Sequence, residues 1–370
     1  MGKLFYEIKN LQIKSSPKNG TVKILNKIYL NIYKSEILGL IGESGSGKSM
    51  LGCALLDMVP AGCLITKGSI AHHFNSNKSI SRIRGIDIAM ISQDPMQALN
   101  PLQKIKTQFA IILRRRFAGN KENIKEQIMK WMEKVNLHLI PNILDRYPHQ
   151  LSGGMRQRVM IAIALSCKPA LLIADEPTTA LDVTIQAQIL DLIKLLQSEI
   201  GMSVMFITHD MGVVAEIADD VVVMRQGKVV ETNTVEALFS SPQHLYTQRL
   251  LESVIKLEHR AFSRPAETDL LAKVNDTIIQ VDNVSVEFSL PKKLFRSKPA
   301  PFRAVDQVSF TLARGENLGI VGESGSGKTT LGRTIASVIT PTQGDIFHTF
   351  GAGRTTALQG LHGEGLANYR

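Results

Sequence analysis

The chain has 370 residues, which is long for one ordinary domain and enough for two. Its composition, with 44% hydrophobic and 21% charged residues, is that of a globular protein with a substantial core. No apolar run approaches the roughly 20 residues that a membrane-spanning helix needs, so we expect no transmembrane segment. The net charge of +10 is dispersed, and the one tight basic cluster is residues 114–116. We expect a solvated helix face there and no nucleic-acid partner.

The cysteines and the N-terminus carry no targeting or metal signal. Cys53, Cys63 and Cys167 are scattered, without the spacing of a metal site, which favours reduced thiols in a cytosolic protein. The first residues include an acid and alternate like a strand, so we expect no signal peptide.

The first 41 residues are predicted to form strands. Period-two alternation over residues 4–14 and 22–33 predicts an antiparallel sheet, and residues 17–20 form a turn signal between the two segments. The apolar run 37–41 predicts a buried strand.

A glycine-rich loop follows that strand and opens a predicted helix over residues 50–56. It consists of Gly42, Glu43, Ser44, Gly45, Ser46, Gly47, Lys48 and Ser49. This strand, loop and helix context is that of a phosphate-binding loop. Its backbone N–H groups and the helix N-terminus attract an anion, the lysine reaches the outer phosphates and the last serine can bind Mg²⁺. The loop therefore predicts a nucleoside triphosphate site.

The next segments alternate between predicted strands and helices. In chain order they are a strand at 87–92, a helical region at 105–139 with Trp131 on its core face, and a helix that follows residues 151–158 and ends at about residue 166. Strands at 170–174 and 203–208 come next, and then a hairpin at 221–230 that turns at Gln226 and Gly227. Such alternation predicts an α/β fold with a mostly parallel sheet and phosphate chemistry at the carboxyl ends of its strands.

Polar residues stand at those strand ends. Asp175 suits Mg²⁺, which takes few protein ligands, and Glu176 can orient or deprotonate an attacking water. His209, taken alone, fits a satisfied strand-end histidine as well as a catalytic group. Ser152, with Gly153 and Gly154 at a helix N-terminus, predicts a second anion site.

The sequence then repeats itself. Residues 319–329 match residues 39–49, which predicts a second phosphate loop containing Gly322, Gly327, Lys328 and Thr329. The expected organisation is a complete domain over 1–255, a linker over 256–276, a truncated second copy over 277–346 and an aberrant, disordered tail over 347–370. We expect the truncated copy to form no stable sheet. A frameshift and a specialised short partner are both open explanations of the tail.

Six motifs in this order resemble an ABC-transporter ATPase of the peptide and nickel importer type. They are the Walker A loop (42–49), the Q-loop Gln93, the signature (151–157), the Walker B pair Asp175 and Glu176, the D-loop (180–182) and the switch His209. The resemblance implies a P-loop NTPase fold with a parallel core, an antiparallel β subdomain and a helical subdomain. It also implies ATP and Mg²⁺ as ligands, with Mg²⁺ contacted by Ser49, Gln93 and Asp175. Glu176, His209 and Gln93 would be catalytic.

The same resemblance implies the partners. The signature would cap ATP held by a facing domain, contributed by a second copy of this chain or by another ATPase. The assembly would lie on the cytoplasmic face of the inner membrane, bound peripherally to integral-membrane permease subunits and served by a solute-binding protein. Hydrolysis would power solute import. An ATP-binding-only remnant and a non-transport ABC ATPase stay open as alternatives.

Two details bear on the substrate and on adenine. Residues 241–251 resemble the His-Pro-Tyr-Thr-x-x-Leu-Leu segment of these importers, with Leu245 in place of the proline. The choice among peptide, glutathione, nickel and another solute stays open.

The aromatic residue that stacks on adenine in the family is replaced by Ser15, whereas the second copy has Phe288.

Overall fold

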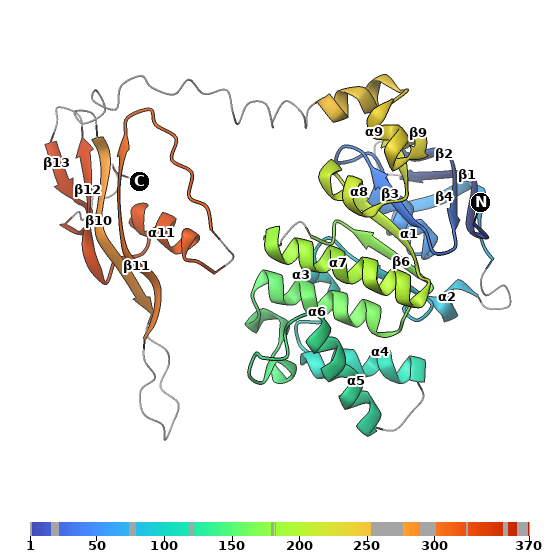
Figure 1. Ribbon diagram of the computed structural model, residues 1–370, viewed down its shortest axis with the longest axis horizontal. Coiled ribbons are helices and arrows are strands. Elements are labelled where there is room, and N and C mark those ends of the chain that lie inside the picture. The colour runs from blue at the N-terminus through green and yellow to red at the C-terminus, as the bar shows by residue number, and fades with distance from the viewer. Residues whose placement is uncertain are drawn as a thin grey trace. The chain divides into compact units, whose positions relative to one another are not determined.

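The computed structural model describes two compact units, Met1–Phe262 and Ser263–Arg370 (Figure 1). The residues described are 2–15, 22–73, 79–117, 121–178, 181, 183–252, 277–288, 301–322, 325–350, 354–360 and 369. The predicted linker over 256–276 lies outside them. Each unit is taken by itself below.

The first unit is built on a six-stranded sheet in the order β5-β6-β7-β3-β8-β9. Its strands are β3 (Ile37–Ile41), β5 (Ile88–Ile91), β6 (Leu171–Asp175), β7 (Ser203–Thr208), β8 (Asp220–Arg225) and β9 (Lys228–Thr234). The first five strands of this order are parallel, and β9 pairs antiparallel with β8 through the predicted hairpin. The predicted α/β class is thus confirmed.

The central strands are buried on both faces, which explains their continuous apolar runs. Along β6, Leu171 and Ile173 pack into one core, and Leu172 and Ala174 pack into another on the opposite face. Because both faces are covered, the polar side chains of these strands stand at the strand ends, with Asp175 and Thr208 at the carboxyl ends of β6 and β7.

Helices cover one face of this sheet. They are α4 (Ile105–Phe117), α5 (Lys121–Lys134), α6 (Gly153–Ser166) and α7 (Val183–Ile200), coloured from turquoise to green in Figure 1. Trp131 is 4% exposed within this core, as predicted. The basic residues 114–116 lie on the exposed surface of α4, also as predicted.

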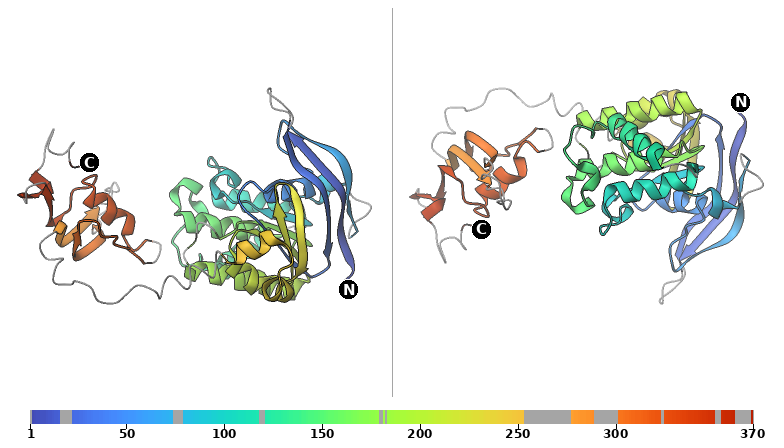
Figure 2. Two further views of the ribbon diagram at one scale, coloured as in Figure 1. Left: turned by 90° about the horizontal axis from the view of Figure 1, so that it is seen from above. Right: turned by 90° about the horizontal axis from the view of Figure 1, so that it is seen from below.

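An antiparallel sheet in the order β2-β1-β4, together with α1 (Lys48–Leu55), covers the other face. The strands are β1 (Leu4–Ser15), β2 (Val22–Tyr33) and β4 (Cys63–His72), and both views in Figure 2 place this blue sheet on the far side from the green helices. The strand β4 was not predicted, because six of its residues in succession are exposed and it shows no apolar alternation.

Short helices complete the first unit. They are α2 (Ile80–Ile83), α3 (Pro95–Ala98), α8 (Met211–Ile217), α9 (Val235–Ser240) and a helical stretch over residues 245–252. Within the described part of the chain, no helix combines the length and apolarity needed to cross a bilayer.

The second unit contains a four-stranded antiparallel sheet in the order β11-β10-β12-β13 and the helix α11 (Lys328–Ile335). Its strands are β10 (Thr277–Phe288), β11 (Phe302–Ala313), β12 (Gln343–Phe350) and β13 (Arg354–Ala357). Two expectations are therefore wrong: the second copy does form a sheet, and strands continue past residue 346.

The physical reason is that this sheet has a core of its own. Val281, Val284 and Ile346 are almost fully buried, and β12 occupies one edge of β10 while β13 pairs with β12. Gly344 approaches Asn283 as Gly68 approaches Asn10 in the first unit, so β10 and β12 reproduce the pairing of β1 with β4. That residues 347–370 are out of frame stays a prediction.

The counterpart of β3 is absent from the described part of the second unit. Residues 316–322 adopt no regular structure, and the side chain of Val321 is 95% exposed, whereas every residue of β3 is buried. As far as its residues are described, the second unit therefore reproduces the antiparallel sheet and the helix after the phosphate loop, without the parallel core between them.

Candidate nucleotide site

The phosphate loop of the first unit depends on glycine at two crowded positions. Gly42 and Gly47 have φ values of +149° and +100°. A Cβ at Gly42 would lie 2.1 Å from the carbonyl oxygen of Met224, and one at Gly47 would lie 2.7 Å from Cδ2 of Leu25. Only glycine allows the loop this backbone and this close an approach.

The loop wraps around the ammonium group of Lys48. Its Nζ donates to the carbonyl oxygens of Gly42, at 2.6 Å, and Glu43, at 3.0 Å. Burial lowers the pKa of Lys48, and the carboxylates of Glu176 and Asp175 act in the opposite direction. Gly47 caps α1 without a side-chain hydrogen bond, which leaves the first N–H groups of the helix available to bind an anion.

Asp175 and Ser49 place two oxygen atoms where they could bind a metal ion. Asp175 ends β6, is 5% exposed, and its Oδ1 has no hydrogen-bond partner among the described residues. Burial raises the pKa of Asp175, while a hydrogen bond from Ser49 acts to lower it. A buried, unsatisfied carboxylate oxygen beside a hydroxyl fits Mg²⁺, which binds through one or two protein oxygens and keeps several waters.

Three of the predicted residues meet at the carboxyl ends of β5, β6 and β7. The amide Nε2 of Gln93 donates to Oε2 of Glu176 at 2.8 Å, and Nδ1 of His209 lies 2.9 Å from Oε1 of Glu176. The Glu176 side chain is 14% exposed and that of His209 is 60% exposed. The carboxylate is thus held at both oxygens while one side stays open to solvent.

The backbone at Glu176 helps to direct this side chain. Its φ of +46° is unusual for a residue with a side chain, and its N–H donates to the carbonyl oxygen of Ile207 at 2.9 Å. Such local strain, imposed by the surrounding sheet, is common at functional positions.

The signature residues lie at the start of α6. Ser152 caps this helix and accepts a hydrogen bond from the N–H of Met155 at 3.3 Å. The buried Gln157 donates to the carbonyl oxygen of Pro177, which ties the signature helix to the segment after Glu176. No hydrogen bond links residues 152–154 to the phosphate loop within the described part of this unit. Residues 180 and 182 of the D-loop lie outside the description.

The second phosphate loop keeps only part of this geometry. Lys328 donates to the carbonyl oxygen of Gly322 at 2.5 Å, and Gly327 caps α11 with a φ of +95°. Thr329 is exposed. The 370 residues contain no second copies of the Q-loop, signature, Walker B or switch motifs.

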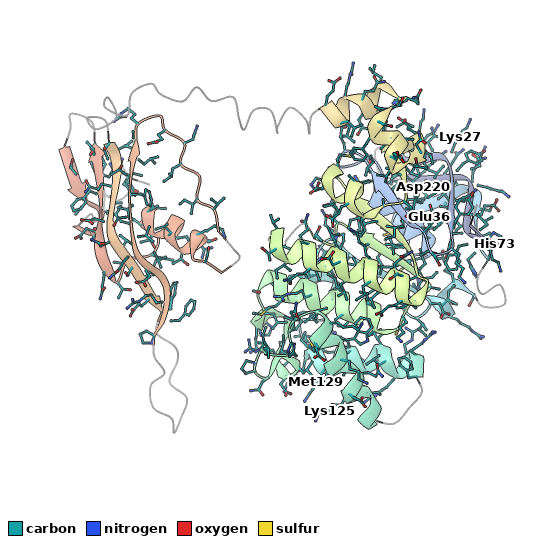
Figure 3. All side chains as sticks on the ribbon, viewed as in Figure 1. Lys27, Glu36, His73, Lys125, Met129 and Asp220 are labelled. Atoms are coloured by element: carbon teal, nitrogen blue, oxygen red, sulfur yellow. The ribbon has the colours of Figure 1, made fainter. Side chains whose placement is uncertain are left out.

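The sequence patterns did not predict two features of the first unit. The hydroxyl of Tyr246 accepts a hydrogen bond from the N–H of Glu43 at 3.0 Å, a contact between residues 203 positions apart. Glu36 shares a hydrogen bond with Asp220, and Figure 3 labels both side chains near the same end of the sheet. The segment containing Tyr246 was noted as a motif, but no spacing in the sequence links it to the loop.

Comparison with known families and proteins agrees with this geometry. The sequence profile described as ABC transporter matches residues 25–179 and 305–364, which together make up more than half of the chain. The chain belongs to the ABC transporter family. Its motif order and the arrangement of its strand ends are thereby explained.

Relatives of this ABC protein extend over most of its length. The glutathione import ATP-binding protein GsiA of Shigella dysenteriae is 43% identical over 367 residues, which cover 92% of this chain and 59% of that protein. GsiA of Pectobacterium atrosepticum is 42% identical over 382 residues, with coverages of 96% and 61%. The chain therefore spans about three fifths of the length of these relatives.

Solved structures support the fold. The ATP-binding cassette MJ0796, in a dimeric post-hydrolysis state bound to ADP and Pi, is 28% identical with a TM-score of 0.55, covering 62% of this chain and 98% of that one. CbiO1 of Clostridium perfringens is 22% identical with a TM-score of 0.52, covering 70% and 99%, and bears on the fold alone. The predicted ABC cassette fold is confirmed.

Proposed function

We propose that this chain hydrolyses ATP at its first unit to power import of a small solute through a membrane permease. The observation that carries this proposal is the Glu176 carboxylate, held by Gln93 and His209 beside the buried Asp175, which accepts a hydrogen bond from the exposed Ser49. A general base, a metal site and a phosphate loop then lie at one edge of one sheet.

Each residue has a role in this proposal. The loop N–H groups and Lys48 hold the phosphates and balance their charge. Glu176 orients the attacking water and accepts its proton, while Gln93 and His209 keep the carboxylate in place. Mg²⁺, bound through Ser49 and Asp175 with Gln93 nearby, would neutralise charge on the phosphates.

The signature residues support a dimer. Ser152 and the N-terminus of α6 form an anion site that makes no hydrogen bond to the phosphate loop of its own unit in the described residues. We assign it to nucleotide held by a facing ABC domain, either from a second copy of this chain or from another ATPase.

A groove beside the Q-loop is our candidate for the permease contact. It has a volume of about 320 Å³ and lies between β5, α4 and α6, with Leu99, Ile111 and Met160 among its lining residues. Leu102, in the same loop, is 86% exposed. Because Gln93 begins this loop, a permease helix seated in the groove would act on the residue that holds Glu176. The protein would then sit peripherally on the cytoplasmic face of the membrane.

The proposed solute class is a small peptide such as glutathione. The relatives named above are glutathione import proteins, and residues 241–251 carry the motif typical of peptide and nickel importers. A solute-binding protein would deliver the solute to the assembled transporter.

ATPase assays of the full chain test the enzymatic part. We expect turnover that is lost in Lys48→Ala and Glu176→Gln and retained in two matched surface controls on α5, Lys130→Ala and Glu126→Gln. Activity no higher than that of the two site variants would instead support an ATP-binding-only protein.

Reconstitution with a candidate permease pair, sought first among the genes that flank this one, tests the transport part. Vesicles should take up glutathione or a short peptide when ATP is supplied. Leu102→Asp should abolish stimulation of hydrolysis by the permease while leaving basal turnover unchanged. Ile111→Asp, at a half-exposed residue that lines the groove, should have the same effect. Full stimulation of both variants would rule out the groove and its loop as the contact.

A further inference from the structure

The peptide unit between Gly42 and Glu43 is held from both sides. Its carbonyl oxygen, on Gly42, accepts a hydrogen bond from Nζ of Lys48 at 2.6 Å. Its N–H, on Glu43, donates to the hydroxyl of Tyr246 at 3.0 Å. One rigid peptide plane therefore lies between the phosphate-binding lysine and a tyrosine from a distant part of the chain.

We propose that Tyr246 is a positioning residue for the phosphate loop. Its hydroxyl fixes the plane of the Gly42–Glu43 peptide and thereby the position of the carbonyl oxygen that accepts from the Lys48 ammonium. The position of the ammonium group relative to the bound nucleotide is fixed in turn. This inference rests on the proposed nucleotide function of the first unit, and it assigns a role to a residue outside the six ABC motifs.

The tyrosine is itself held firmly. Its side chain is 5% exposed, and the guanidinium carbon of Arg225 lies 4.9 Å from the centre of its ring. Its N–H donates to Nδ1 of His244 at 3.1 Å. The carboxylate of Glu231, on β9, accepts from the N–H groups of Gln243 at 2.8 Å and His244 at 2.9 Å. The hydroxyl is thus presented by a braced turn rather than by a free side chain.

The hairpin that carries this brace also contacts the loop directly. The N–H of Gly227, at the turn between β8 and β9, donates to the carbonyl oxygen of Ser46 at 3.0 Å. The carbonyl oxygen of Met224 lies so close to Gly42 that no Cβ fits between them. Residues 224–246 therefore support the loop at three points, and Tyr246 supplies the side-chain contact.

Electrostatics gives this contact its effect on Lys48. A hydroxyl that accepts from an N–H polarises the peptide and makes the carbonyl at its other end a better acceptor, since hydrogen bonds in a chain strengthen one another. Tyr246→Phe keeps the ring and the Arg225 contact and removes only the hydroxyl. One net hydrogen bond in such a setting corresponds to a change of about 3- to 10-fold in an equilibrium constant.

The first experiment measures ATP and ADP affinity of the full-length Tyr246→Phe variant by equilibrium binding. We expect both dissociation constants to rise about 3- to 10-fold and kcat/KM for ATP to fall by the same factor. Tyr6→Phe is the matched control, because Tyr6 is also buried and donates its hydroxyl to the Leu55 carbonyl at the far end of α1. It should alter the melting temperature and leave nucleotide affinity unchanged.

A double-mutant cycle separates positioning from a general structural role. In a Lys48→Ala background, adding Tyr246→Phe should weaken ATP binding no further, because the tyrosine acts through the lysine. An equal loss in both backgrounds, or no loss in either, would overturn the inference. Absence of ATP binding by the unsubstituted chain would instead count against the proposed function, so the two failures are distinguishable.

Discussion

Nδ1 of His209 lies 2.9 Å from Oε1 of Glu176, and the amide of Gln93 lies 2.8 Å from the other carboxylate oxygen. The three side chains come from the ends of three neighbouring parallel strands. Because Gln93 and His209 both restrain the Glu176 carboxylate, we expect the three residues to act together in hydrolysis.

The first prediction concerns these three residues. Glu176→Gln should lower kcat about 100-fold or more, because it removes the general base, and His209→Ala should lower it by a similar order. The double variant should be hardly slower than Glu176→Gln alone, because residues that act together are not additive. Steady-state ATPase kinetics provide the measurement. His138→Ala, at an exposed position, is the control, and fully multiplicative losses would contradict the coupling.

The second prediction concerns the metal site. Asp175→Asn removes a buried carboxylate whose pKa is raised by burial. Without metal and nucleotide, the variant should therefore have a free energy of unfolding about 1 kcal/mol higher than that of the unsubstituted protein, and a higher melting temperature. The same change should raise the Mg²⁺ concentration needed for half-maximal hydrolysis at least about tenfold. Asp191→Asn on the exposed face of α7 should do neither. An unchanged Mg²⁺ requirement would show that Asp175 does not bind the metal.

The third prediction concerns the adenine base. Ser15 ends β1 and pairs with Val22 at the start of β2. Further along β2, Leu25 packs against Gly47 of the phosphate loop. Ser15→Tyr should restore a stacking surface and tighten ATP binding by about 0.5–1.5 kcal/mol. Competition with inorganic triphosphate provides the readout, since affinity for that ligand should stay unchanged. Ser198→Tyr on α7 controls for a general effect of the added ring.

The fourth prediction concerns Glu36. Burial, with Asp219 and Asp220 nearby, raises its pKa from 4.5 to about 7. The folded protein therefore holds this proton more tightly than the unfolded chain, so the stability that it contributes is complete below pH 4.5 and is lost as the pH rises through 7. Between pH 5 and pH 8 the loss should amount to about 1–3 kcal/mol.

Thermal melting over that pH range tests the assignment. Glu36→Gln should flatten the decline, because a neutral amide can still accept from the N–H of Tyr33 and donate to Asp220. Glu199→Gln, at an exposed position, should leave the decline as it was. An identical pH profile in Glu36→Gln would mean that another group titrates.

Sequence patterns anticipated the central sheet well, because its strands are buried on both faces and read as continuous apolar runs. They failed for β4, whose residues are mostly exposed, and for the second unit. In the second unit we expected no sheet because the parallel core is missing. The strands β10, β11 and β12 nevertheless share a core around Val284, so their sheet does not depend on a parallel core.

The sequence by itself determined the phosphate loop, the motif order and the family. Each motif consists of neighbouring residues, such as the glycines of the loop or the polar residues that follow an apolar run, so it can be recognised without the fold. The tertiary structure alone decided that Gln93 and His209 hold opposite oxygens of Glu176, and that Tyr246 reaches Glu43. Those contacts join residues 33 to 203 positions apart. Their existence depends on how strands pair and helices pack, which no local pattern specifies.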